Sequence, residues 1–149
     1  MKAYVCDLET NGLLHELDRV HSMVLRDMET GEVISCTNET SLVNNYHPIA
    51  HGLDLLAKAD VVIGHNFINF DARAIAKVYP SFKAKPDSAI HDTLIISRVL
   101  SPEMEMVDDQ KYAHIPPKYR GKHSLAAWGE RLGVEKIKFT ENEKKSKGA

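Results

Sequence analysis

The amino-acid sequence predicts an α/β fold built around a mixed β-sheet. Strand-like and helix-like segments alternate along the chain. Turn signals alone separate the first strands, as in antiparallel hairpins, whereas helices separate the later strands, as in parallel sheets. The chain has 149 residues, of which 43% are hydrophobic and 27% charged, and this is the composition of one globular domain. A collagen-like, disordered or low-complexity chain is therefore excluded.

Three strands open the predicted fold. Lys2–Asp7 is expected to form a short buried strand that ends on a carboxylate. Val20–Asp27 alternates in polarity and is the second predicted strand. Glu32–Cys36 follows it after the tight turn Glu29-Thr30-Gly31, so these two segments are expected to pair as a hairpin.

Two further strands and four helices complete the predicted domain. Val61–Gly64 is a continuous apolar run, as expected for a strand buried on both faces, and Ala89–Asp92 is another short strand. Apolar spacing and end signals predict four helices. Proline and glycine interrupt the first half of the first helix. Ser124 caps the N-terminus of the last helix, and Gly133 ends it. These helices are Leu42–Ala59, Asp71–Tyr79, Thr93–Leu100 and Ser124–Leu132.

The remaining C-terminal segments are predicted to be irregular. Residues 103–122 are polar, charged and proline-containing, which is typical of a long loop. Residues 135–149 are rich in lysine, so we expect a domain over residues 1–134 and a basic, flexible tail over 135–149. The net charge is −8 over residues 1–110 and +6 over residues 111–149. This asymmetry suits an enzyme that binds both a metal ion and a polyanion, although scattered surface charge explains it equally well.

The two cysteines and the hydropathy pattern predict the compartment. Cys6 and Cys36 stand far apart without metal-binding spacing, so we expect core residues in a reducing environment. The sequence contains no apolar run of 18 residues and no basic-then-apolar leader. We therefore expect a cytoplasmic protein that makes no membrane contact.

The first candidate site is the sequence Asp7-Leu8-Glu9. Side chains at positions i and i+2 of an extended strand point to the same side, so the two carboxylates would be neighbours. A hard divalent cation, Mg²⁺ or Mn²⁺, would relieve their repulsion. The alternative is that Asp7 only ends the strand and that Glu9 is solvated.

The second candidate site follows the predicted strand Val61–Gly64. A polar loop with His65 and Asn66 leads there to Asp71 at the start of a helix. Ligands of open α/β sheets bind beyond the carboxyl ends of the strands, so Asp71 could join Asp7 if the two strands are neighbours. Alternatively, Asp71 is a helix N-cap and Asn66 a turn residue.

Two further positions lie just before predicted helices. Asp92 ends a predicted strand, where capping of the next helix is favoured over support of a metal site. Lys122 and His123 precede the helix Ser124–Leu132, where both can face a phosphate.

In combination, four segments resemble the 3′→5′ proofreading exonuclease domain of family A DNA polymerases, in the branch encoded by short-tailed phages. They are D-L-E-T-N-G-L at 7–13, G-H-N-F-I-N-F-D at 64–71, H-D-T-L at 91–94 and H-S-L-A-A-W-G-x-R-L-G at 123–133. The resemblance implies an RNase H-like fold of the DEDD exonuclease superfamily, with a mixed five-stranded sheet flanked by helices. It also implies hydrolysis of single-stranded DNA from the 3′ end, in phage DNA replication or proofreading in the host cytoplasm.

The resemblance further implies roles for individual residues. Asp7, Glu9 and Asp71 would be the catalytic residues and would hold two Mg²⁺ or Mn²⁺ ions. Leu13 would lie against the terminal base, and the Phe67 ring would stack on bases. The implied substrate-binding residues are Thr10, Asn11, Gly12, Leu13, His65, Asn66, Phe67, Lys122 and His123.

One family motif is absent. The family carries Y-x-x-x-D or H-x-x-x-D, which supplies a fourth carboxylate and a residue that orients the water, but no Tyr or His in this sequence is followed four residues later by Asp. The chain could be a fragment of a polymerase, one piece of a split polymerase completed by a polymerase subunit or second polypeptide, or a stand-alone protein. In the last case Asp92, His123 or a neighbouring subunit could complete the site. The rival functions are a module that binds DNA or a polymerase without full catalysis, and a ribonuclease on the same fold.

Overall fold

The computed structural model describes residues 1–39 and 46–134. The predicted tail and the start of the first predicted helix, residues 42–45, lie outside this part. The chain divides into two compact units, which we call the sheet unit (Met1–Ile96) and the helical unit (Ser97–Ala149), and each is described by itself. Among the described residues, no helix has the length and apolar character needed to cross a membrane.

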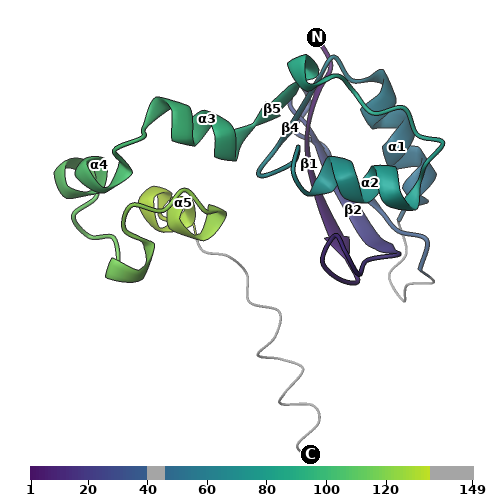
Figure 1. The fold of residues 1–149 in the computed structure, drawn as a ribbon. Helices are drawn as coiled ribbons and strands as arrows, with labels where there is room; N and C mark the ends of the chain where they lie inside the picture. Colours follow the sequence, from purple (N-terminus) through teal and green to yellow (C-terminus); the bar gives the residue numbers. More distant parts are fainter. Residues whose placement is uncertain (40–45, 135–149) are drawn as a thin grey trace, which may run out of the picture. The chain divides into compact units, whose positions relative to one another are not determined.

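The sheet unit contains the predicted five-stranded mixed sheet, in the order β3-β2-β1-β4-β5 (Figure 1). β2 pairs antiparallel with both β1 and β3, whereas β4 pairs parallel with both β1 and β5. Short connections permit the antiparallel pairs, and helical crossovers produce the parallel ones. The strands are β1 (Ala3–Thr10), β2 (Val20–Asp27), β3 (Val33–Cys36), β4 (Val61–Gly64) and β5 (Ile90–Asp92).

Helices α1 (Ile49–Lys58) and α2 (Asp71–Val78) pack on this sheet and bury its core. Gly52 allows α1 to approach closely, since a Cβ atom at this position would lie 2.6 Å from Met23 Sδ. α1 begins later than predicted because Pro48 occupies its N-cap position with extended backbone angles. Cys6 and Cys36 are buried free thiols, so the prediction that both are core residues is confirmed.

The helical unit contains the end of α3 (Thr93–Leu100), α4 (Met104–Lys111) and α5 (Leu125–Leu132). A 3₁₀ turn at Pro117–Tyr119 precedes α5. In the sheet unit, a similar turn at Asp87–Ala89 precedes β5. The predicted caps of α5 are confirmed: Ser124 Oγ accepts a hydrogen bond from the Ala127 N–H, and Gly133 ends the helix with φ of +66°.

The prediction of one long loop over residues 103–122 is wrong, because α4 lies inside it. Asp108 of α4 is fully buried and forms two hydrogen bonds with Arg131 of α5, of 2.6 and 2.8 Å. It also accepts a hydrogen bond of 2.8 Å from the Gly121 N–H. A polar segment is thus held as a helix by tertiary contacts that outweigh its weak local preference.

Candidate active site

The C-terminal half of β1 presents two carboxylates on one side of the strand. Cys6 and Leu8 are buried, whereas Asp7 and Glu9 are exposed, which is the alternation that a strand requires. The β1–β2 register shifts between Glu9 and Thr10. Glu9 pairs with Ser22 and Thr10 with Val20, so the additional residue, His21, lies on β2 and the regular pairing is interrupted beside the predicted site residues.

Asp71, the first residue of α2, is buried close to Asp7. Burial and, after it, the negative charge of Asp7 raise the pKa of Asp71 to about 7. Hydrogen bonds from the backbone N–H groups of Asp71 and Leu8 act in the opposite direction. The fold therefore brings together two of the three predicted carboxylates, which are 64 positions apart in the sequence.

The donor chemistry of the Asp7–Asp71 pair fits a hard divalent cation, because both side chains offer carboxylate oxygens and repel each other without one. A complete site is not assembled, however. Within residues 1–39 and 46–134, no group of three or more His, Cys, Asp or Glu side chains is placed to hold a metal ion. Glu9 shares the exposed side of β1 with Asp7 but does not complete such a group, and its role as a ligand stays a prediction.

Asp92, at the end of β5, binds backbone N–H groups, and its predicted support of the metal site stays a prediction. Its carboxylate accepts hydrogen bonds from three backbone N–H groups, those of Asn66 (2.9 Å), Ile68 (3.0 Å) and Leu94 (3.0 Å). The side chain thus binds the start of α3 and also fixes the loop after β4, in which Asn66 adopts a φ of +62°. Asp92 is 2% exposed and its negative charge contributes to the raised pKa of Asp71.

His65 follows β4 and is oriented by a threonine. Its Nδ1 lies 2.9 Å from Thr93 Oγ1, and this hydroxyl lies 3.2 Å from the Gly64 carbonyl oxygen. Because the single hydroxyl proton is donated to the carbonyl, the hydroxyl accepts from the Nδ1–H of His65. Thr93 was not among the predicted site residues, although it belongs to the H-D-T-L segment.

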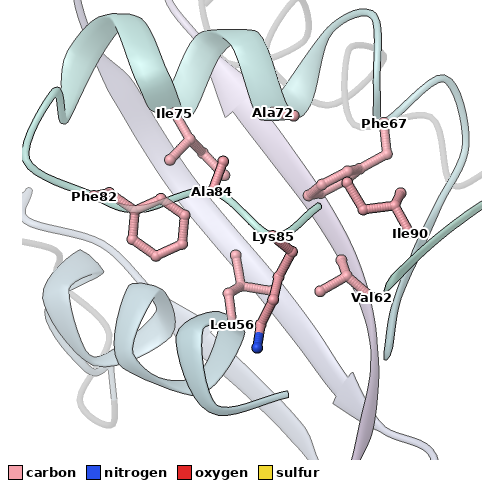
Figure 2. A pocket seen from close by; sticks show the side chains of 9 residues that line it. All are labelled: Leu56, Val62, Phe67, Ala72, Ile75, Phe82, Ala84, Lys85 and Ile90. Carbon is pink, nitrogen blue, oxygen red and sulfur yellow. The ribbon is translucent and has the colours of Figure 1, made fainter. Parts of the chain in front are cut away.

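Phe67 corrects one prediction. Phe67 is 4% exposed and belongs to the core of the sheet unit, so its ring is not accessible for stacking on bases. Figure 2 shows the ring pointing into a small apolar pocket that Leu56, Val62 and Ile75 also line. Gly64 creates the space for it, since a Cβ atom there would lie 2.7 Å from the ring.

The loop between β1 and β2 carries the other predicted substrate contacts. Leu13 is 62% exposed, as a contact with a terminal base requires. By contrast, Thr10 and Asn11 use their side chains inside the loop: Thr10 Oγ1 donates to the Gly12 carbonyl, and Asn11 bonds to Asp18. Lys77 of α2 also bonds to this loop, at the Leu14 carbonyl, and no sequence signal pointed to it.

Lys122 and His123 belong to the helical unit. Lys122 is exposed, and His123 is half-buried with its Nδ1 2.6 Å from Ser97 Oγ. Ser97 also accepts a hydrogen bond from Trp128 Nε1. Burial, and then the positive charges of Arg98 and Arg131, lower the pKa of His123. Contacts of these two residues with a substrate stay predictions.

Comparisons with known proteins agree with the resemblance seen in the motifs. No protein-family model matches the sequence. The chain is 29% identical to the DNA-directed DNA polymerase of Escherichia phage T7 and 28% identical to that of Enterobacteria phage T3, in each case over 95% of this chain. It spans only 20% of the length of these relatives.

Two solved structures share the fold. An ExoI/SSB-Ct complex superposes with a TM-score of 0.56 at 14% identity, covering 93% of this chain and 37% of that one. The zinc-bound E. coli ExoI–ssDNA complex gives 0.55 at 13% identity, covering 90% and 35%. The predicted RNase H-like fold is thereby confirmed. The sequence similarity to the phage polymerases and the shared fold are consistent with the predicted DEDD exonuclease domain.

Proposed function

We propose that this chain is a metal-dependent 3′→5′ exonuclease that hydrolyses the terminal phosphodiester of single-stranded DNA. The observation that carries the proposal is the buried Asp71 carboxylate beside Asp7, at the carboxyl end of the strands of an exonuclease-type fold. Ligand sites of open α/β sheets lie at this edge. The similarity to phage DNA polymerases supports a place in phage DNA replication or proofreading, in the host cytoplasm.

Asp7 and Asp71 would hold Mg²⁺ or Mn²⁺, with Glu9 beside them on the same side of β1. When bound, two such ions activate a water molecule and stabilise the departing 3′ oxygen. The water oxygen bonds to phosphorus as the bond from phosphorus to the 3′ oxygen of the penultimate nucleotide breaks. That 3′ oxygen takes up one proton of the water to become a hydroxyl, and the terminal nucleoside 5′-monophosphate leaves. Asp92 fixes the loop with His65 and Asn66, and the exposed Leu13 is available to the last base.

A second candidate function is a module that binds DNA or a polymerase without full catalysis. It is favoured by one observation, namely that the described residues assemble no three-ligand metal group. A polymerase subunit or another polypeptide would then supply the missing carboxylate. The two candidates differ in whether the purified chain turns over DNA by itself.

The experiment follows a single-stranded DNA labelled at its 5′ end, incubated with the purified chain and Mg²⁺, Mn²⁺ or chelator. We expect a metal-dependent ladder that shortens from the 3′ end. Asp7→Ala and Asp71→Asn should abolish it, because each removes a carboxylate of the pair. The matched control is Asp54→Ala, an exposed position on α1 that should retain wild-type activity.

Two outcomes would count against the exonuclease. A folded wild-type chain that produces no ladder with either metal favours the binding module. A ladder that persists in Asp7→Ala at the wild-type rate contradicts the assignment of the metal site.

A further inference from the structure

The connection between β1 and β2, residues 11–19, is closed at its base by a single asparagine. The Asn11 N–H donates to the Arg19 carbonyl over 3.2 Å. Asn11 Oδ1 accepts hydrogen bonds from the N–H groups of Asp18 (3.2 Å) and Arg19 (3.1 Å), and Asn11 Nδ2 donates to Asp18 Oδ1 over 2.7 Å. Hairpin loops of this length have no fixed turn geometry of their own, so these four bonds define where the loop begins and ends.

Further bonds within the loop fix the backbone of Leu13. Its carbonyl accepts hydrogen bonds from the N–H groups of Glu16 (2.8 Å) and Leu17 (2.7 Å). The Leu17 side chain has no exposed surface and anchors this turn in the core of the sheet unit. The Leu13 side chain, by contrast, is 62% exposed. An exposed apolar side chain is therefore presented from an ordered backbone.

A second anchor joins the loop to α2. Lys77 Nζ donates to the Leu14 carbonyl over 2.9 Å. Lys77 lies in the last turn of α2, and Asp71 is the first residue of the same helix. The loop thus follows directly on β1, which carries Asp7, and is bonded at Leu14 to the helix that carries Asp71.

We propose that Asn11 and Lys77 are positioning residues that hold the loop 11–19, and with it Leu13, in a fixed place relative to Asp7 and Asp71. The inference rests on the proposed exonuclease function and deepens it. It also reassigns Asn11, which the motif resemblance implied as a substrate contact: Asn11 acts through the loop rather than by touching DNA. Lys77 acts in the same way, through the Leu14 carbonyl.

The kinetic experiment measures kcat and KM on a single-stranded oligonucleotide with Mg²⁺ for Asn11→Ala and Lys77→Met. We expect kcat/KM to fall roughly tenfold to a hundredfold, because small displacements of a positioning group have effects of this size. In a Leu13→Ala background the same substitutions should have little further effect, since they act through Leu13. Fully additive losses would overturn the proposal. Lys58→Met, at the corresponding end of α1, is the matched control.

A swap distinguishes positioning from direct contact with DNA. Asn11→Asp places a carboxylate next to Asp18 and should lower activity. Combining it with Asp18→Asn restores a donor–acceptor pair between the two positions and should recover activity. If Asn11 contacts DNA directly, the combined variant stays as impaired as Asn11→Asp.

Amide hydrogen exchange on the full chain provides a readout that does not depend on catalysis. In Asn11→Ala and Lys77→Met, the amides of Glu16 and Leu17 should exchange faster while those of β1 and β2 stay protected. Unchanged protection of Glu16 and Leu17 would overturn the proposal even in an active enzyme. If the wild type has no nuclease activity, the proposed function fails, and hydrogen exchange still decides whether the two residues hold the loop.

Discussion

The sheet unit and the helical unit are stabilised in different ways. The sheet unit buries a continuous apolar cluster between its strands and helices. In the described part of the helical unit, the buried apolar side chains are Met104, Ile115 and Ala127, and the buried Asp108–Arg131 pair lies beside them. Val99, Leu100 and Leu132 are more than 60% exposed there. The comparison teaches that apolar burial organises the unit with the candidate site, whereas one ion pair organises the other.

The largest effect is expected when the ion pair is broken on one side. Arg131→Met should lower the free energy of unfolding by about 3–5 kcal/mol, because it leaves the Asp108 carboxylate buried and unpaired. Chemical denaturation of the full chain measures the loss, and hydrogen exchange should locate it in α4 and α5. The double variant Asp108→Leu/Arg131→Met is the control and should recover most of the loss. If Arg131→Met alone is neutral, the ion pair does not organise the helical unit.

In the sheet unit the matching change is a cavity in the apolar core. Leu25 of β2 has no exposed surface, so Leu25→Ala should cost about 2–5 kcal/mol of stability. Hydrogen exchange should show the loss across the strands. If the amides of α4 and α5 lose as much protection as those of the strands in this variant, the two units unfold together. The claim that they are stabilised separately would then be wrong.

Acid should weaken the helical unit through Asp108. Hydrogen bonds from Arg131 hold the pKa of this carboxyl below its ordinary value. The stabilisation is therefore present above the unfolded pKa of about 3.9 and is lost as the pH falls through the lower folded value. Circular dichroism between pH 7 and 2 should show a transition at low pH that is smaller in Asp108→Leu/Arg131→Met. If the wild type and the double variant show the same transition, the acid sensitivity comes from groups other than Asp108.

The smallest effect concerns the cap of α5. Ser124→Ala removes the hydrogen bond to the Ala127 N–H and should cost about 1 kcal/mol, the usual value for an N-cap. Thermal denaturation measures it against Ser124→Asp, which keeps an acceptor at this position. A loss of several kcal/mol would indicate that Ser124 supports more than the helix terminus.

Local patterns predicted the fold well because each element carries its own signal. The alternation in β2, the apolar run in β4 and the caps of α5 depend on neighbouring residues only. These signals sufficed for the five strands, and they indicated that Asp71 could join Asp7 if their two strands are neighbours, as β1 and β4 are.

What the sequence did not disclose depends on distant partners. α4 forms in a polar segment because Asp108 meets Arg131, 23 positions further on. Phe67 stands between asparagines, and the resemblance implied that its ring stacks on bases, but Gly64 makes room for the ring in the core. The bond between Lys77 and the Leu14 carbonyl spans 63 positions, and nothing in either segment indicates it.

The most direct test of the account is calorimetric titration of the purified chain with Mn²⁺. The account predicts saturable binding that is lost in Asp7→Asn and in Asp71→Asn, because both carboxylates hold the ion, and that is retained in Asp54→Asn. Binding that is unchanged in Asp7→Asn and Asp71→Asn, or no binding by the folded wild type, would contradict it.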